Sequence, residues 1–139
     1  LTGNPETNGR IFKLQNTAKG SGVLAVFNID ASDGAARGSI SPDDIDGLCG
    51  EEFAVYEHFT KQVFTVKKGQ RIPLTLETRD NFRLYNFVPI KDGFAALGDI
   101  SKFICPLTVK SADKNSGAET LEHTDCLIFE DGKFEAVKA

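Results

Sequence analysis

The sequence has no methionine and no tryptophan, and it holds only two histidines, three cysteines and two tyrosines in 139 residues. Because the chain begins at Leu1 and lacks methionine, we interpret it as an excised or processed piece of a larger protein. No apolar run approaches the roughly 18 residues that a membrane-spanning helix needs. The 16 basic residues form no dense block, and the net charge is −4. These absences argue against nucleic-acid and membrane partners.

The scarcity of cysteine and histidine bears on redox setting and metal binding. Cys49, Cys105 and Cys126 are widely spaced and form no C-x-x-C pair. Such a set predicts free thiols in a reducing setting, which favours the cytoplasm, or buried small apolar residues. One disulfide with one free thiol stays open as an alternative. Strong zinc sites pair ligands about two to five residues apart, and neither His58 nor His123 supplies that spacing. We therefore expect no metal and no cofactor.

Catalytic motifs are also missing. The sequence contains no G-x-S-x-G, no Gly-rich phosphate loop and no H-E-x-x-H. The segment 30–34 places oxygen ligands at short intervals but lacks the later bidentate Glu of a calcium loop, so it predicts a solvated turn. Cys49 with His58 or His123 has the residue types of a nucleophile and its base, but a buried small residue is the simpler interpretation of Cys49. Asp43, Asp44 and Asp46 are conceivable catalytic carboxylates, but a helix start, where carboxylates are favoured electrostatically, is a simpler reason for two of them. We predict that this chain alone carries no catalytic residue.

What the sequence does contain is short strands. The longest apolar run, 22–30, has the length and the β-branched and aromatic content of a strand. Successive side chains of a strand point to opposite faces. We expect one face to pack on an opposing sheet (Val23, Ala25, Phe27 and Ile29), and the other to form a candidate interdomain face for a neighbour outside the domain (Leu24 and Val26). At least one of these last two side chains should then be exposed, within an apolar patch of several hundred square ångströms.

The rest of the chain supports an all-β fold. A short helical turn is expected near 41–47, where Ser41 can cap and Pro42 suits the first position. Asp131–Gly132 predicts a hairpin turn, and 110–118 a loop. The segment 35–40 is expected to extend a hairpin from the strand before it. Further strands are expected over 11–16, 53–59, 62–66, 71–77, 82–90, 94–98, one or two within 100–109, 125–129 and 133–137. The prediction is one antiparallel, Greek-key-like β-sandwich domain over residues 1–139.

A sugar-binding module is the main alternative to a structural role. Sugar-binding surfaces usually present flat aromatic platforms, for which Trp and Tyr are preferred. Trp is absent here, and both tyrosines, Tyr56 and Tyr85, fall inside strand patterns. The 11 phenylalanines are core or interface material. The sequence therefore has few of the side chains that an independent sugar-binding module needs.

Several segments, in their order and spacing, resemble the C-terminal region of the raffinose synthase and alkaline α-galactosidase group of glycoside hydrolase family 36. They are Ile11-Phe12-Lys13-Leu14-Gln15-Asn16, Gly22-Val23-Leu24-Ala25-Val26-Phe27-Asn28, Ser41-Pro42-Asp43-Asp44-Ile45, Phe53-Ala54-Val55-Tyr56, Asn86-Phe87-Val88-Pro89-Ile90, Phe94-Ala95-Ala96-Leu97-Gly98 and Asp125-Cys126-Leu127-Ile128-Phe129. Each motif alone is unspecific.

The resemblance implies an antiparallel β-sandwich that follows a (β/α)₈ catalytic barrel and packs against it. In that family two aspartates of the barrel carry out hydrolysis or galactosyl transfer on α-galactosides, so none of them is carried onto this chain. The segment 29–34 departs from the Gly-rich, Trp-containing segment of plant members, which argues against raffinose-forming specificity and favours a bacterial relative. The expected function is a non-catalytic accessory domain; the alternative is a module that contacts α-galactosides directly.

Overall fold

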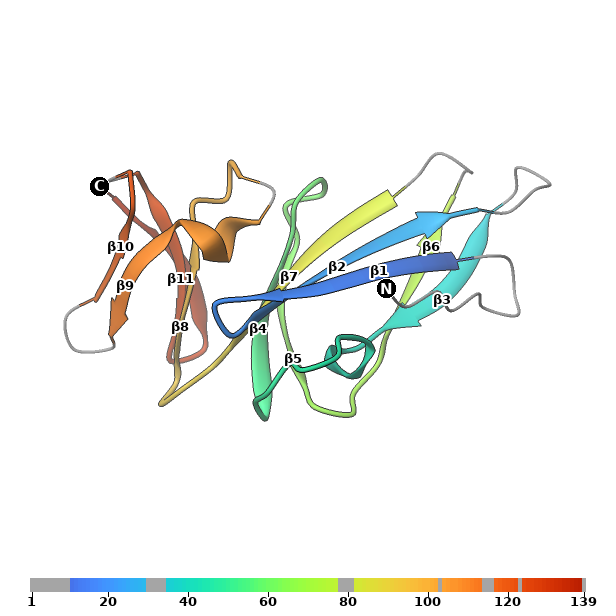
Figure 1. Ribbon diagram of the computed structural model, residues 1–139, viewed down its shortest axis with the longest axis horizontal. Helices are drawn as coiled ribbons and strands as arrows, with labels where there is room; N and C mark the ends of the chain where they lie inside the picture. The colour runs from blue at the N-terminus through green and yellow to red at the C-terminus, as the bar shows by residue number, and fades with distance from the viewer. Residues whose placement is uncertain are drawn as a thin grey trace.

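The computed structural model describes residues 11–29, 35–77, 82–102, 104–113, 117–122 and 124–138. These residues form an elongated body of antiparallel β-sheets (Figure 1). The central sheet has five strands in the order β1-β2-β7-β4-β5. Their bounds are β1 (Ile11–Ala18), β2 (Ser21–Asn28), β7 (Phe82–Pro89), β4 (Glu52–Glu57) and β5 (Val63–Lys67).

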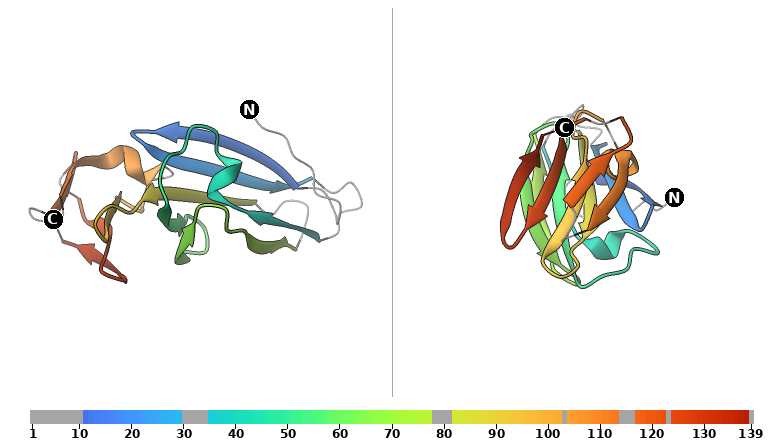
Figure 2. Two further views of the ribbon diagram at one scale, coloured as in Figure 1. Left: turned by 90° about the horizontal axis from the view of Figure 1, so that it is seen from below. Right: turned by 90° about the vertical axis from the view of Figure 1, so that its left-hand side faces the viewer.

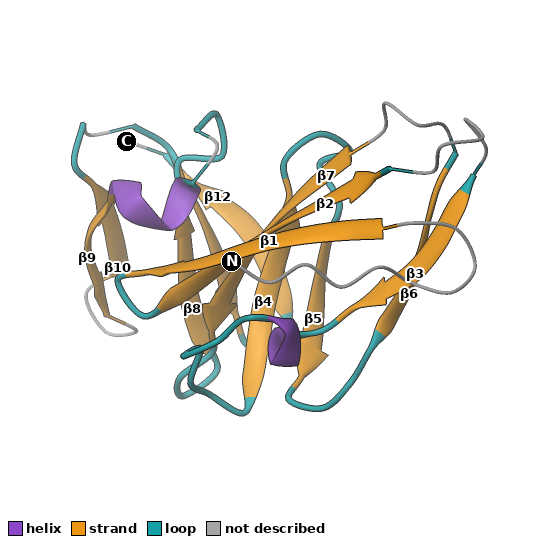
Figure 3. Ribbon diagram, turned by 45° about the vertical axis from the view of Figure 1, so that its right-hand side comes forward, coloured by secondary structure: helices purple, strands orange, loops and turns teal. Residues whose placement is uncertain are grey.

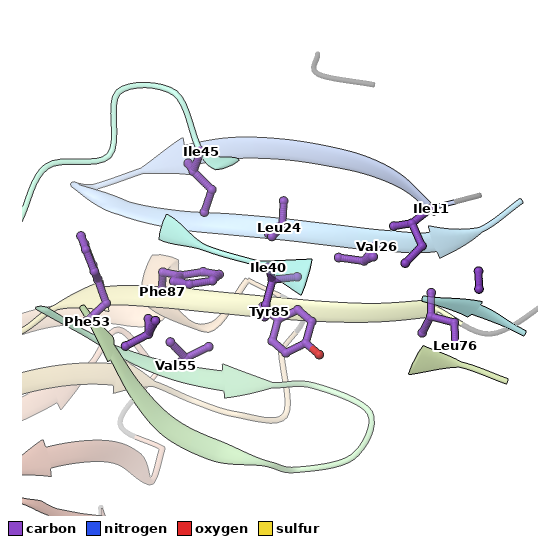
Figure 4. Packing of buried hydrophobic residues seen from close by; sticks show 12 residues of the cluster. Ile11, Leu24, Val26, Ile40, Ile45, Phe53, Val55, Leu76, Tyr85 and Phe87 are labelled. Atoms are coloured by element: carbon purple, nitrogen blue, oxygen red, sulfur yellow. The ribbon is translucent and has the colours of Figure 1, made fainter. Parts of the chain in front are cut away.

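The first hydrophobic core lies on one face of this central sheet. A two-stranded sheet of β3 (Ala36–Ile40) and β6 (Ile72–Leu76) covers the face, together with the short 3-10 helix η1 (Pro42–Asp44) and the segment after it. Gly22 of β2 makes room for that segment, because a Cβ at this position would lie 2.8 Å from Ile45 Cδ1. Figure 4 shows the side chains that meet in the first core: Ile11, Leu24, Val26, Ile40, Ile45, Phe53, Val55, Leu76, Tyr85 and Phe87.

A second core lies on the other face of the central sheet, toward one end of the body. Here the three-stranded sheet of β8 (Phe94–Gly98), β11 (Cys126–Glu130) and β12 (Lys133–Val137) packs on β4 and β7. Its members are Ala54, Tyr56, Val88, Ala95, Leu97, Cys105, Leu127 and Phe129. Cys105 belongs to the second 3-10 helix, η2 (Cys105–Thr108).

A third core lies on the outer side of the β8-β11-β12 sheet. The hairpin of β9 (Val109–Asp113) and β10 (Gly117–Thr120) covers it, as the end-on view in Figure 2 shows. Strand β8 therefore has Ala95 and Leu97 in the second core, and Phe94 and Ala96 in the third. This explains why the run 94–98 is apolar at every position, since a strand between two packed layers has no solvent face.

Several sequence predictions are confirmed. The described residues form antiparallel sheets, and their helices are the two 3-10 turns (Figure 3). The helical turn begins as expected, with the Ser41 side chain accepting from the Asp43 backbone N–H at 3.1 Å. The β11–β12 hairpin turns at Asp131 and Gly132, both with positive φ, as a two-residue type I′ loop requires.

No helix among the residues described is long and apolar enough to cross a membrane.

Three sequence predictions are wrong. Where one or two strands were expected within 100–109, residues 105–108 form η2 and β9 begins only at Val109, because Pro106 has no N–H to give to a ladder. The expected loop 110–118 is largely the β9–β10 hairpin, whose Val109 and Ala118 pack on the third core. Strand β3 extends no hairpin with β2 but pairs with β6. The predicted alternation of β6, by contrast, is confirmed, since Leu76 is buried and Thr75 is exposed.

Candidate interaction surface

The residues that sequence reasoning considered for chemistry do not come together. His58 follows β4 and its ring packs edge-on against Phe59 at 4.9 Å between centroids. Cys49 is exposed, Cys105 and Cys126 are buried, and all three are free thiols. His123 and the segment 30–34 lie outside the described residues. Within the part of the chain that is described, no three His, Cys, Asp or Glu side chains are placed to hold a metal ion.

Asp44, one of the conceivable catalytic carboxylates, has a structural role. Its Oδ2 accepts hydrogen bonds from Lys13 Nζ and from the Ser41 backbone N–H, each at 3.1 Å. Arg71 Nη2 donates to both of its carboxylate oxygens at 3.1 Å. The Lys13 side chain is only 1% exposed, so its ammonium depends on this partner. Asp44 thus ties β1 to η1 and to the residue that precedes β6.

Glu57 is a second carboxylate with a structural role. It is fully buried, and Oε1 accepts from the backbone N–H groups of Phe59 at 3.0 Å and Thr60 at 2.6 Å. Its Oε2 accepts from the Leu84 N–H at 2.7 Å. Three backbone donors satisfy a carboxylate well, so Glu57 holds the β4–β5 turn against β7.

The buried thiols are also unsuited to nucleophilic chemistry. Burial raises the pKa of the Cys105 thiol to about 12. Burial raises the pKa of Cys126 as well. A thiol attacks as its thiolate, so both should be inert at neutral pH. The sequence interpretation of cysteines as small buried residues holds for these two and is wrong for exposed Cys49.

The structure corrects the prediction that Leu24 and Val26 form an interdomain face. Both side chains are 0% exposed and lie in the first core (Figure 4). The expectation of an exposed Leu24 or Val26 is therefore wrong. The alternation along β2 is real, but its two faces are the reverse of the prediction: β3, β6 and η1 cover the Leu24 side. The side predicted to face a sheet carries Val23, Ala25 and Phe27.

On that second side of the central sheet, the strand register aligns three rows of side chains across β1, β2 and β7. Phe12 pairs with Phe27 and Phe27 with Phe82. The next row is Leu14, Ala25 and Leu84, and the third is Asn16, Val23 and Asn86. None of these nine side chains is charged. We call the six residues of the first two rows (Phe12, Phe27, Phe82, Leu14, Ala25 and Leu84) the open half-face.

The described part of the chain covers the open half-face only partly. Leu84 is 9% exposed, and the other five side chains are half-buried. The β8-β11-β12 sheet packs on Ala54, Tyr56 and Val88, at the other end of the same face. In Figure 1 this sheet lies at one end of the body, while β1, β2 and β7 run on beyond it.

A series of aromatic rings crosses this surface. The rings of Phe27 and Phe82 stack at 5.1 Å between centroids with 15° between their planes. Phe59 meets Phe82 at 4.6 Å with its ring tilted by 65°. At the rim, Phe59 and Ile29 are each 43% exposed. Stacked and edge-on rings hold each other in place, so the surface is preformed.

Sequence reasoning missed Phe12 and Phe82 as surface residues and assigned Phe27 to the core. The available signal was the alternation in 12–15, where Phe12 and Leu14 flank Lys13. The buried side of that strand is the one with the lysine, because Lys13 finds Asp44 there. A sequence pattern that takes lysine as exposed assigns the two faces the wrong way round.

Two grooves flank the second core. One, of about 720 Å³, lies between the β4–β5 and β11–β12 hairpins, and its lining includes Glu51, Glu52, Phe129 and Phe134. The other, of about 640 Å³, lies beside the β1–β2 turn and includes Lys19 in its lining. The Lys19 ammonium donates to the carbonyls of Leu107 and Val109, each at 3.2 Å.

No protein-family model matches the chain, and no curated protein matches it. Three solved glycoside hydrolases resemble it in fold. They are a proposed α-N-acetylgalactosaminidase from Bacillus halodurans (13% identity, TM-score 0.48, 62% of this chain and 19% of that one), a β-L-arabinopyranosidase of family 27 from Geobacillus stearothermophilus (21%, 0.46, 62% and 18%) and α-galactosidase I from Mortierella vinacea (19%, 0.45, 60% and 21%).

The likeness describes part of the fold only. The chain spans about a fifth of the length of these three enzymes, and none of them is a raffinose synthase. At such identities and TM-scores the functional argument has to come from the chain's own residues.

Proposed function

We propose that this chain is a non-catalytic accessory domain of a glycoside hydrolase that acts on α-galactosides, and that it packs against and stabilises the catalytic barrel. The supporting observation is where the segments that resemble family 36 lie. Four of them fall on β1, β2, β4 and β7, which are adjacent in the central sheet, and a fifth forms η1. The last two fall on β8 and β11, which pair in the next layer. The resemblance thus runs through one contiguous packed unit.

The engaged carboxylates support a non-catalytic role. Asp44 and Glu57 have their oxygens committed to Lys13, Arg71 and backbone donors. A retaining glycosidase needs two carboxyl groups about 5–5.5 Å apart with room for a sugar between them. Neither carboxylate is free to act in that way, so the catalytic pair would belong to another part of the parent enzyme.

One observation favours the alternative, a module that binds α-galactosides directly. The larger groove combines the carboxylates of Glu51 and Glu52 with Phe129 and Phe134, and aromatic surface beside a few polar groups is common in ligand sites. Phe129 is only 8% exposed, however, and its ring is packed edge-on against Phe134 at 5.0 Å. Little aromatic surface is left for a sugar ring.

The test compares the full-length gene product with the same protein lacking residues 1–139. We expect an upstream barrel with paired aspartates, and a lower Tm with faster loss of α-galactosidase activity after the deletion. Calorimetric titration of the 139-residue chain with melibiose and raffinose should show no saturable binding. A gene product without a barrel would overturn the proposal, and saturable binding would favour the alternative.

A further inference from the structure

The open half-face lacks the groups that bind a polar ligand. Its six side chains are three phenylalanines, two leucines and an alanine, and none can donate or accept a hydrogen bond. A sugar or a nucleic acid buries hydroxyl or phosphate groups, which must find partners in the site or lose free energy. The surface is therefore suited to an apolar protein surface and not to a polar small molecule.

The same face already shows what covers it elsewhere. At its other end, Ala54 and Val88 pack against Ala95, Leu97 and Leu127 of the β8-β11-β12 sheet. The rows of the open half-face lie further along β2 and β7 on this face, beyond the row of Asn16, Val23 and Asn86, and no charged residue lies between them. A second protein layer on the open half-face would extend an existing sheet packing, with layers about 10 Å apart.

The size of the surface distinguishes between possible partners. Same-face positions lie about 6.8 Å apart along a strand and about 4.8 Å apart across strands, so six positions cover roughly 200 Å². Adding Phe59 and Ile29 raises this to roughly 260 Å², and a matching partner brings the total to about 520 Å². Separate proteins that associate stably bury about 1,200–2,000 Å² in total. Interfaces between domains of one chain begin at about 600 Å², so they are the class nearest to this total.

Resting on the proposed function, we infer that the open half-face docks on an uncharged surface of the catalytic domain in the same polypeptide, with the row Phe12, Phe27 and Phe82 at its centre. A tethered domain is present at high effective concentration, so a small apolar contact suffices where two free copies would separate. The docking side is thus opposite to Leu24 and Val26, which stay in the first core.

Chemical labelling of an introduced thiol tests the assignment. In a Cys49→Ser background, which removes the exposed native thiol, Ala25→Cys places a thiol in the middle row of the open half-face. Thr75→Cys, at an exposed position of β6, is the matched control. Maleimide labelling is followed in the 139-residue chain and in the full-length gene product. We expect the Ala25→Cys thiol to react about tenfold or more slowly in the full-length protein, and the Thr75→Cys thiol to react equally in both. Adding Phe27→Lys should restore the rate.

The other outcomes separate this inference from the proposed function. A full-length protein with a barrel but with equal labelling of Ala25→Cys in both contexts overturns the inference and leaves the accessory role standing. A gene product without a catalytic domain overturns the accessory role itself. Protection in the 139-residue chain that grows with protein concentration identifies a second copy as the partner. Protection by melibiose in that chain identifies a sugar, and either result overturns the inference.

Discussion

Gly98 ends β8 at a position that only glycine can occupy. Its φ is +99°, and a Cβ there would overlap the Cys105 carbonyl and lie 2.6 Å from Thr108 Oγ1 of η2. We expect Gly98→Ala to lower the free energy of unfolding through two effects: about 1–2 kcal/mol for the backbone conformation and about a further 1–3 kcal/mol for the overlap with η2. Urea denaturation measures the change.

Gly132 provides the matched control for this prediction. Its φ of +89° is also positive, but a Cβ there would meet nothing within 4 Å. Gly132→Ala should therefore lose only the backbone part. Equal losses for the two variants would show that η2 moves aside and that the overlap at Gly98 costs nothing.

The two tyrosines give a second test at the residue scale, because without tryptophan the phenolate absorbance is theirs alone. Burial raises the pKa of Tyr85 to about 12, with the nearby Glu57 carboxylate adding to the effect. Burial also raises the pKa of Tyr56. Unfolded tyrosines release their proton near pH 10. Between about pH 10 and 12 the folded state therefore holds more protons, so its stability is present below this window and is lost as the pH rises through it.

Spectrophotometric titration of the folded chain and of the chain in guanidinium measures this shift. The folded chain should ionise later than the unfolded chain. Phenols that ionise near pH 10 in both states would contradict the packing of Tyr56 in the second core and Tyr85 in the first.

The role of a residue was predictable from the sequence where its interaction partner lies close to it along the chain. Ser41, Pro42 and Asp44 indicate a helix start from their spacing alone, and the structure has the reciprocal capping of Ser41 and Asp44. The pairing of Lys13 with Asp44 joins residues 31 positions apart. No local pattern contains that information, and it is this pair that allows a lysine to lie on the buried side of β1.

At the scale of the element, β2 shows how a correct strand was given the wrong faces. Both sides of 22–28 are apolar, so alternation identifies two sets of side chains without saying which set is covered. The decision comes from β3, β6 and the segment after η1, which pack on Leu24 and Val26. The β9–β10 hairpin was missed for a different reason: only two of its side chains, Val109 and Ala118, pack on the third core, which is too few to form a pattern.

Substitutions at neighbouring positions of β2 test the assigned faces. Leu24→Lys would bury an unpaired ammonium in the first core and should cost more than about 4 kcal/mol, enough to prevent folding. Ala25→Lys can extend its ammonium to solvent from the open half-face, so the free energy of unfolding should change by about 0.5 kcal/mol or less. Circular dichroism and urea denaturation of both variants provide the measurement. Tolerance of Leu24→Lys together with loss of folding in Ala25→Lys would restore the original face prediction.

At the scale of the whole molecule, the four sheets are joined in series through three cores. The second core is the link between the central sheet and the outer layers, since it contains residues of β4 and β7 on one side and of β8 and β11 on the other. The all-β class was predictable from strand spacing, but this serial order was not, because β8 and β11 give equal apolar patterns toward the second and third cores. Long-range packing, not local pattern, decides which layers are neighbours.

The serial arrangement predicts that one side chain couples the unfolding of the two ends. Leu97 is fully buried in the second core, and Leu97→Ala should lower the free energy of unfolding by about 2–5 kcal/mol. Tyr85 lies in the first core and Tyr56 in the second, so in a Tyr56→Phe background tyrosine fluorescence follows the first core alone, whereas circular dichroism follows all the sheets. In this background the two urea curves should coincide, as expected for one cooperative unit. In Leu97→Ala the two curves should separate.

Leu24→Ala is the control: it removes a similar volume from the first core, so its two curves should shift together. Coincident curves in Leu97→Ala would show that contacts outside the second core, such as those of η2, are enough to hold the layers in one unit.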